Sequence, residues 1–158
     1  MGYAVLKSIH LLGVIVWLGG MFFALWCLRP AVAALDPATR VTVMREALGR
    51  FLNAVVVAAL LVLVTGAWLI ATASRGSVKA GIGFNMPLDW HVMVTLGVLM
   101  MVIFGYVRFA LYPRLQERAE ARNWAGAGEV LARIRRLVAL NLGLGVVIVV
   151  VTRLGAVA

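Results

Sequence analysis

Apolar residues along this chain gather into four long runs, separated by segments in which polar and charged residues are frequent. The runs cover residues 3–28, 53–73, 88–112 and 137–154, and each approaches or exceeds the roughly 20 residues that a helix needs to cross a bilayer. None of them alternates apolar and polar residues with period two, as the strands of a membrane barrel do. With their polar flanks, the runs predict an all-α membrane protein with helices over residues 3–28, 45–73, 88–118 and 128–154.

Short segments connect successive helices, which favours antiparallel neighbours and an up-down-up-down four-helix bundle. Because each helix must bury its inner face against the others, residues 1–158 are expected to form a single membrane domain. In such a bundle the first and third helices stand diagonally, with their axes about 12 to 14 Å apart. A homo-oligomer is compatible with this arrangement.

The composition agrees with a membrane protein, and the charge gives its orientation. The chain is 64% hydrophobic and 13% charged, with a net charge of +9. Eleven of its 15 Lys and Arg residues lie in or beside the connections between the first and second and between the third and fourth helices. The positive-inside rule therefore puts those connections in the cytoplasm and both termini in the periplasm. The bilayer accounts for the basic charge, and no nucleic-acid partner is expected.

The only two histidines, His10 and His91, fall in the first and third membrane helices. An ionisable residue inside a span indicates a functional site, because burying it in hydrocarbon is costly unless a partner binds it. Arg29 follows His10 by 19 residues and Arg108 follows His91 by 17, so the two histidines lie at similar depth near the periplasmic face.

Helix phase at 100° per residue predicts which side chains share a face with each histidine. On the first helix, Lys7, Gly13 and Trp17 lie on the same stripe as His10. On the third helix the stripe of His91 also contains Val94, Thr95, Val98, Val102 and Gly105. Both stripes are expected to point into the bundle.

A diagonal gap between two histidines suits a haem better than a bare metal ion held by both imidazoles. The hypothesis is a b-type haem with His10 and His91 as axial ligands to the iron. Lys7 would meet a haem propionate, and Gly13, Trp17 and Thr95 would line the pocket. Such a protein would be a membrane oxidoreductase that exchanges electrons with a quinone or a periplasmic redox partner. The alternative is that both histidines are structural and bind neighbouring helices or interfacial water.

Several short motifs carry a family resemblance across nearly the whole chain. They are His10-Leu11-Leu12-Gly13 with Trp17, Gly19-Gly20 and Phe22-Phe23, then Arg50-Phe51, Thr65-Gly66 and Trp90-His91-Val92-Met93. These motifs resemble the copper-resistance protein D (CopD) family. The resemblance implies copper movement across the bacterial inner membrane beside a periplasmic copper carrier. In this alternative, copper would be bound by His10 and His91 with Met86 or Met93, since thioether ligands suit Cu(I).

The first helix also resembles that of the small haem-binding membrane protoporphyrinogen oxidases. In that family a first-helix histidine and a third-helix lysine are the important residues. Here the third helix contains no lysine, and His91 and Met93 stand nearby instead. A haem-dependent oxidase of this type is therefore a further alternative function. Two other buried polar residues, Asn53 and Asn141, are expected to form hydrogen bonds between helices.

Overall fold

The computed structural model describes residues 2–81, 83 and 85–155. Within this part the chain is helical without any strand, and four helices are long and apolar enough to cross a membrane. They run over Gly2–Ala31, Pro37–Lys79, Leu88–Glu120 and Trp124–Leu154. The protein is therefore a multi-pass, four-helix membrane protein, which confirms the fold class predicted from the apolar runs.

Two of these helices are interrupted by a short π-helical segment. The first helix consists of α1 (Gly2–Phe23), η1 (Ala24–Leu28) and α2 (Arg29–Ala31), and the third of α4 (Leu88–Tyr106), η2 (Val107–Leu111) and α5 (Tyr112–Glu120). Both π segments end two residues before a proline, Pro30 or Pro113, which has no N–H to donate. The wider π-helical turn lets the helix continue although this backbone hydrogen bond is missing, and π segments are found where the regular i→i−4 hydrogen-bond pattern is disturbed.

The second helix, α3 (Pro37–Lys79), is longer at both ends than the predicted 45–73, whereas the fourth, α6 (Trp124–Gly155), begins four residues before the predicted start. The start of α3 is fixed by Asp36, whose side chain accepts the backbone N–H groups of Ala38 and Thr39 at 3.1 and 3.0 Å. At the other end, residues 74–79 remain helical although the apolar run ends at residue 73, and the Ser77 hydroxyl bonds back to the Ala73 carbonyl.

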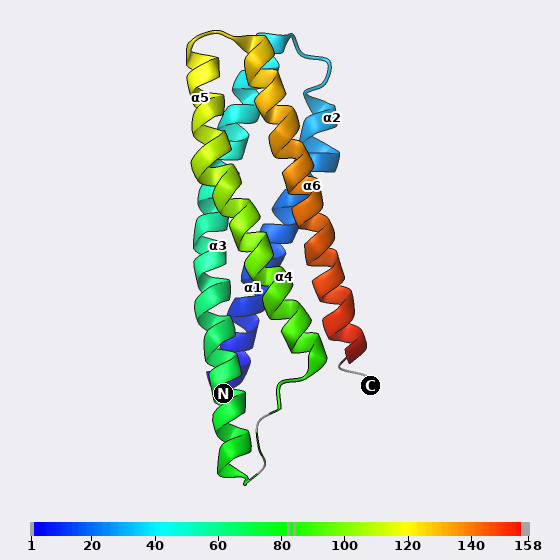
Figure 1. Cartoon of the computed structure of the whole chain (residues 1–158). Helices are drawn as coiled ribbons and strands as arrows, with labels where there is room; N and C mark the ends of the chain where they lie inside the picture. Colours follow the sequence, from blue (N-terminus) through cyan, green and yellow to red (C-terminus); the bar gives the residue numbers. More distant parts are fainter. Residues whose placement is uncertain (1, 82, 84, 156–158) are drawn as a thin grey trace.

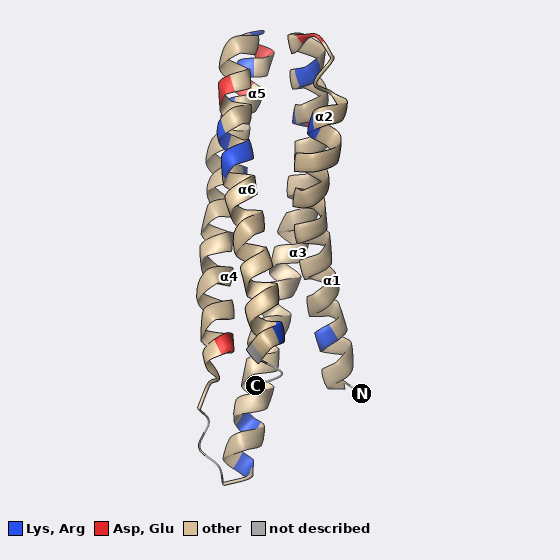
Figure 2. Ribbon diagram, turned by 90° about the vertical axis from the view of Figure 1, so that its right-hand side faces the viewer, with Lys and Arg blue, Asp and Glu red and all other residues tan. Residues whose placement is uncertain are grey.

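The helices run up and down in turn, and both termini lie at one end of the bundle (Figure 1). We call this the terminal end, and the opposite end, where α2 connects to α3 and α5 to α6, the arginine-rich end. α1 packs chiefly along α3, and α4 along α6, while α6 also contacts α1 and α3. Figure 2 shows most of the basic residues at the arginine-rich end, with a few at the terminal end.

Large apolar side chains cover the outside of the bundle as well as its core. Leu52, Leu111 and Leu115 are fully buried between helices, yet Trp26 and Phe109 are 60% and 72% exposed. A soluble monomer rarely exposes so much apolar surface. In a bilayer these outer side chains contact lipid tails, so the exposed apolar surface is what the fold requires.

Candidate functional site

A partly open cavity of about 370 Å³ lies between the helices of the bundle and is lined by all four of them. His10 and Trp17 of α1, Gly66 of α3, and Met93 and Met101 of α4 lie in its wall, together with apolar residues of α6. We call it the histidine cavity. Since His10 and Met93 lie within the first three turns of α1 and α4, which both begin at the terminal end, the cavity occupies the half of the bundle towards that end.

His10 is half-buried, and its ring is held by two oxygen acceptors of α3. Its Nδ1 lies 3.1 Å from the carbonyl oxygen of Val62 and 3.0 Å from Oγ1 of Thr65. The Thr65 hydroxyl donates its own hydrogen to the carbonyl of Leu61, so its oxygen accepts at His10. A carbonyl oxygen only accepts hydrogen bonds, and therefore the ring proton sits on Nδ1. The lone pair of Nε2 is left free, the state in which histidine binds a metal.

Small residues allow α1 to lie close enough to α3 for these bonds. A Cβ placed on Gly66 would stand 3.2 Å from Cε1 of His10, and one on Gly13 would stand 2.8 Å from Cγ2 of Val62. Gly13 thus allows the close contact between α1 and α3. The haem hypothesis required Gly13 to line the cavity, but it is not among the described lining residues. Close approach through small residues is the usual way in which membrane helices pack.

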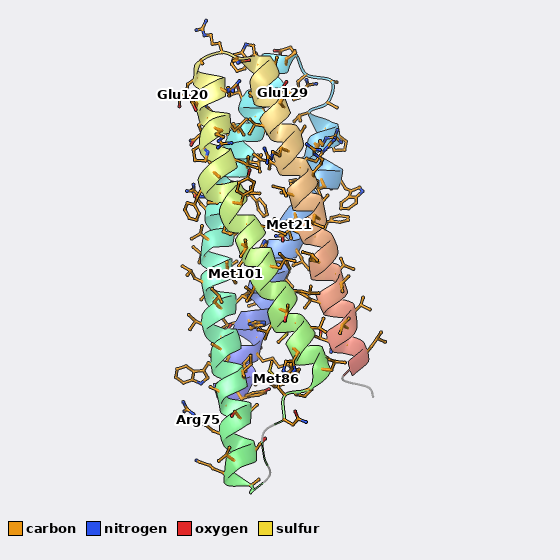
Figure 3. All side chains as sticks on the ribbon, viewed as in Figure 1. Met21, Arg75, Met86, Met101, Glu120 and Glu129 are labelled. Carbon is orange, nitrogen blue, oxygen red and sulfur yellow. The ribbon has the colours of Figure 1, made fainter. Side chains whose placement is uncertain are left out.

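Three methionines of α4 supply sulfur to the same cavity. Met93, Met100 and Met101 all line it, and Met100 is only 4% exposed. Figure 3 shows Met101 and Met21 midway along the bundle, with Met86 near the terminal end. Met86, the other methionine expected as a ligand, is not among the lining residues that the structure describes. Imidazole nitrogen and thioether sulfur together form a donor set that suits copper, above all Cu(I).

The prediction that the stripe of His91 points into the bundle holds for only part of the stripe, because Val94 and Val98 line the histidine cavity but His91 does not. His91 is exposed, its Nδ1 lies 3.1 Å from the carbonyl oxygen of Pro87 in its own helix, and Val98 and Val102 on the same stripe are 54% and 64% exposed. α4 also lines the cavity with Met93, Gly97, Met100 and Met101. The error has a physical origin, because α4 is apolar on all sides and its sequence holds little information about which face is inside.

The residues proposed for a haem pocket are consequently not brought together. Lys7 and Thr95 are exposed, and neither they nor His91 lie among the described residues that line the histidine cavity. Trp17 does line it and is 4% exposed, with its ring edge-to-face on Phe104 at a centroid distance of 5.7 Å. Haem ligation by two histidines does not fit this cavity and stays a prediction without structural support.

Two further spaces continue from the histidine cavity towards the arginine-rich end. The first, the small cavity, has only about 10 Å³ and shares Trp17 with the histidine cavity. Asn141 lies in its wall, is 3% exposed, and leaves its Oδ1 without a hydrogen-bond partner among the described residues. The second, of about 460 Å³, is a cleft that shares Val138 with the small cavity. The three spaces thus follow one another along the bundle.

The sequence analysis assigned Thr65 no role at the site, although Thr65-Gly66 is part of the family resemblance, because a threonine in a helix ordinarily bonds back to its own carbonyls. It does so here, to Leu61, and in addition accepts the His10 ring. The pairing of Thr65 with Gly66 in the sequence is the signal that could have found it, since a hydroxyl beside a glycine suits a close helix contact. Within the described chain, no group of three His, Cys, Asp or Glu side chains is close enough to hold a metal, so any metal bound at His10 would rely on methionine.

Comparison with known families gives one match. The family model described as "Copper resistance protein D" matches residues 45–154, which cover α4 with its three methionines, most of α3 and nearly all of α6. No curated protein and no solved structure matches the chain.

Proposed function

Because the chain belongs to the copper resistance protein D family, we propose that it takes up copper as Cu(I) in the histidine cavity and passes it through the membrane. The single observation that carries this proposal is the fixed orientation of His10. Its Nδ1 is engaged by Val62 and Thr65 of α3, which leaves Nε2 as a free metal ligand beside the methionines of α4.

The donor set suits transport as well as binding. Cu(I) is a soft monovalent ion, and neutral imidazole and thioether groups bind it without adding charge to the cavity. Asp and Glu are absent from the described residues that line the cavity, so hard divalent cations such as Mg²⁺ find no carboxylate there. Neutral ligands also hold the ion weakly enough to release it, a requirement of any conducting site.

The order of the cavities along the bundle supports a route for the ion. From the histidine cavity it would pass Trp17 into the small cavity, where Met21 and Asn141 offer a sulfur and an oxygen. The small cavity has room for about one water, so an ion must leave its hydration shell behind to pass it. We propose that the chain lies in a bacterial inner membrane with its terminal end towards the periplasm, where a copper carrier would deliver the ion.

Cu(I) binding to purified protein in detergent tests this proposal most directly. The affinity is measured under anaerobic conditions by competition with a chromogenic Cu(I) chelator. His10→Asn retains an N–H in the position of Nδ1 and loses the Nε2 ligand, while Met93→Leu removes a sulfur from the cavity with little change of volume. His91→Ala is the matched control, because it removes the other histidine, which is exposed.

The proposal expects His10→Asn to lower the Cu(I) affinity about 100-fold and Met93→Leu about 10-fold, with His91→Ala unchanged, while all variants retain the thermal unfolding midpoint of the unchanged protein. Copper uptake into proteoliposomes should fall in the same order. Equal binding by the unchanged protein and His10→Asn would overturn the proposal. So would a haem absorption band that both His10→Asn and His91→Ala abolish, which would favour the bis-histidine haem instead.

A further inference from the structure

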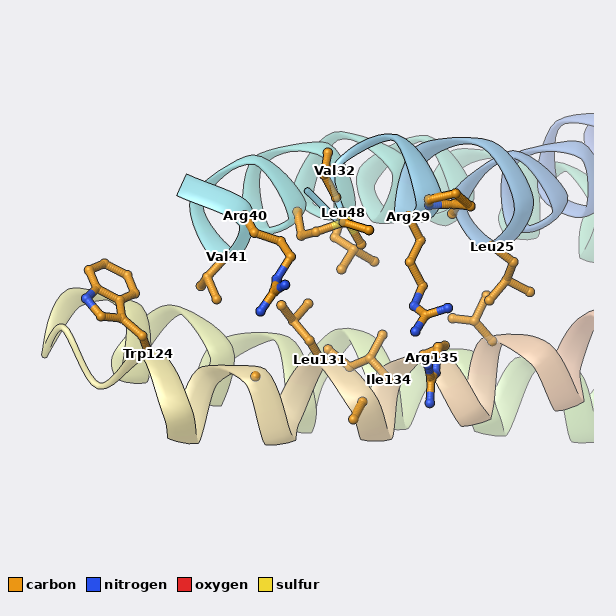
Figure 4. Close-up of a pocket in the computed structure, with 17 residues that line it drawn as sticks. Leu25, Arg29, Val32, Arg40, Val41, Leu48, Trp124, Leu131, Ile134 and Arg135 are labelled. Carbon is orange, nitrogen blue, oxygen red and sulfur yellow. The ribbon is translucent and has the colours of Figure 1, made fainter. Parts of the chain in front are cut away.

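The cleft of about 460 Å³ at the arginine-rich end combines a basic rim with an apolar interior. Figure 4 shows Arg29 and Arg40 extending from α2 and the start of α3 towards α6, which carries Arg135. We call this space the arginine cleft. Its volume falls in the range of sites that bind small molecules or the headgroup of a larger one.

The charge of the arginine cleft is uncompensated by the residues around it. Three arginines lie in its wall, and the described lining residues include no Asp or Glu. The remaining wall is largely apolar, with Leu48 and Ile134 only 6% and 2% exposed. Positive charges over a weakly polarisable floor repel cations and attract an anion strongly, especially one that can accept several guanidinium hydrogen bonds.

The arginine cleft lies between η1 and α2, the start of α3, and α6. At the same end of the bundle, the second and third membrane helices are held together by the Tyr112 hydroxyl, which donates to the Arg45 carbonyl at 3.3 Å, and by Arg108, which donates to Asn53 Oδ1 at 3.2 Å. This second bond confirms the interhelical role predicted for Asn53. The cleft lies between η1 and α2 on one side and α6 on the other, and both η1 and α6 also carry exposed apolar side chains such as Trp26 and Leu140.

We infer that the arginine cleft binds an anionic phospholipid, with its phosphate between Arg29, Arg40 and Arg135 and the start of an acyl chain on the apolar wall. A phospholipid matches both parts of the cleft, and it has lateral access from the bilayer at the depth where basic residues begin to replace apolar ones. Basic pockets between membrane helices at a cytoplasmic face bind anionic headgroups in this way. A soluble anion would match the arginines but leave the apolar wall uncovered.

Native mass spectrometry of the full chain, released from micelles doped with phosphatidylglycerol or with phosphatidylcholine, measures this preference. The test variant is R29Q/R135Q, which removes two of the three charges from the arginine cleft. R114Q/R136Q is the matched control, since it removes two arginines from the same end of the bundle that do not line the cleft. A parallel thermal-shift series uses phosphatidylglycerol and, separately, inorganic phosphate.

We expect the unchanged protein and R114Q/R136Q to retain phosphatidylglycerol in preference to phosphatidylcholine. In R29Q/R135Q the ratio of phosphatidylglycerol to phosphatidylcholine affinity should be about 30-fold lower. Equal retention of both lipids would overturn the inference. An equal loss in the two double variants would also overturn it, because the attraction would then be diffuse surface charge. A thermal shift by inorganic phosphate as large as that by phosphatidylglycerol would reassign the cleft to a soluble anion. None of these results depends on copper binding.

Discussion

The Nδ1 atom of His10 lies 3.0 Å from Oγ1 of Thr65, on the neighbouring helix and 55 residues away in the chain. Together with the Val62 carbonyl, this hydroxyl fixes both the tautomer and the direction of the imidazole. A metal ligand oriented by a second residue in this way binds more tightly, because its orientation is set before the metal arrives. The orientation of His10 as a metal ligand therefore depends on residues of α3 as well as on its own helix, α1.

Replacement of Thr65 should weaken copper binding without removing any ligand. Thr65→Val keeps the shape of the side chain and deletes one of the two acceptors at Nδ1, so we expect the Cu(I) affinity to fall about 10-fold. Thr65→Ser keeps the hydroxyl and is the control, with an affinity within about twofold of the unchanged protein. Chelator competition measures both. If the two variants bind alike, Thr65 does not orient His10.

Gly66 should be sensitive to a single added methyl group. The new Cβ of Gly66→Ala would stand 3.2 Å from Cε1 and 3.5 Å from Nδ1 of His10, so the ring must shift by a few tenths of an ångström. We expect the Cu(I) affinity to fall about 10-fold, since small displacements of an oriented ligand are costly.

The matched control for this prediction is Gly76→Ala, in the same helix. A Cβ on Gly76 meets no other atom within 4 Å, and alanine favours the helix over glycine by roughly 1 kcal/mol. This variant should bind copper as the unchanged protein does and unfold at an equal or higher temperature. A loss of copper affinity in Gly76→Ala as large as in Gly66→Ala would contradict the role of Gly66 at His10.

The number and approximate extent of the membrane helices could be predicted from the sequence, because length and hydropathy alone decide which segments cross a bilayer. The inward face of the third helix could not. In a soluble helix the polar residues mark the outside, but lipid accepts the same apolar side chains as the core, and so Val102 outside and Met100 inside look alike in the sequence. The prediction for His91 failed for this reason.

The candidate site was predictable only in part. His10 and Trp17 could be found because a histidine is unusual in a membrane span and a tryptophan shares its face. The Thr65 contact depends on how α3 turns towards α1, which is decided by close packing at Gly13 and Gly66. The grouping of three methionines depends on how α4 packs along α6. Contacts of this kind join distant parts of the chain and leave no local pattern.

The start of α3 should respond to acid through Asp36. Hydrogen bonds from the hydroxyl and the backbone N–H of Thr39 hold the pKa of Asp36 below its ordinary value. A lowered pKa means that this capping contribution is fully present above the unfolded-state pKa and is lost as the pH falls through the folded-state pKa. Between pH 7 and pH 5 no change is therefore expected, and fraying should begin only below about pH 4.

Hydrogen exchange of a peptide covering residues 36–44, corrected for the intrinsic rate, measures this loss. Asp36→Ala should raise exchange about fivefold at pH 7. Asp36→Asn can still accept the same N–H groups and does not titrate, so its protection should not vary between pH 7 and pH 3. Protection in the unchanged protein that is equally independent of pH over this range would show that the carboxylate does not cap α3.

A substitution of Asn141 should change the stability of the protein and its transport rate in opposite directions. Its side chain is 3% exposed and its Oδ1 has no hydrogen-bond partner among the described residues, which costs roughly 1 to 3 kcal/mol of folding free energy unless a water fills the small cavity. Asn141→Leu has a similar volume and no polar atoms. It should therefore raise the thermal unfolding midpoint, whereas Asn141→Asp, which buries a charge, should lower it.

A buried amide that destabilises the fold needs a function, and its place between the histidine cavity and the arginine cleft gives one. If copper passes the small cavity, Asn141→Leu removes the oxygen that replaces hydration there, and uptake into proteoliposomes should slow about 10-fold. Cu(I) affinity measured by chelator competition should stay the same, because the histidine cavity is intact. A more stable Asn141→Leu protein that transports copper at the original rate would place the route elsewhere, and a less stable one would show that the amide has a partner in the folded protein.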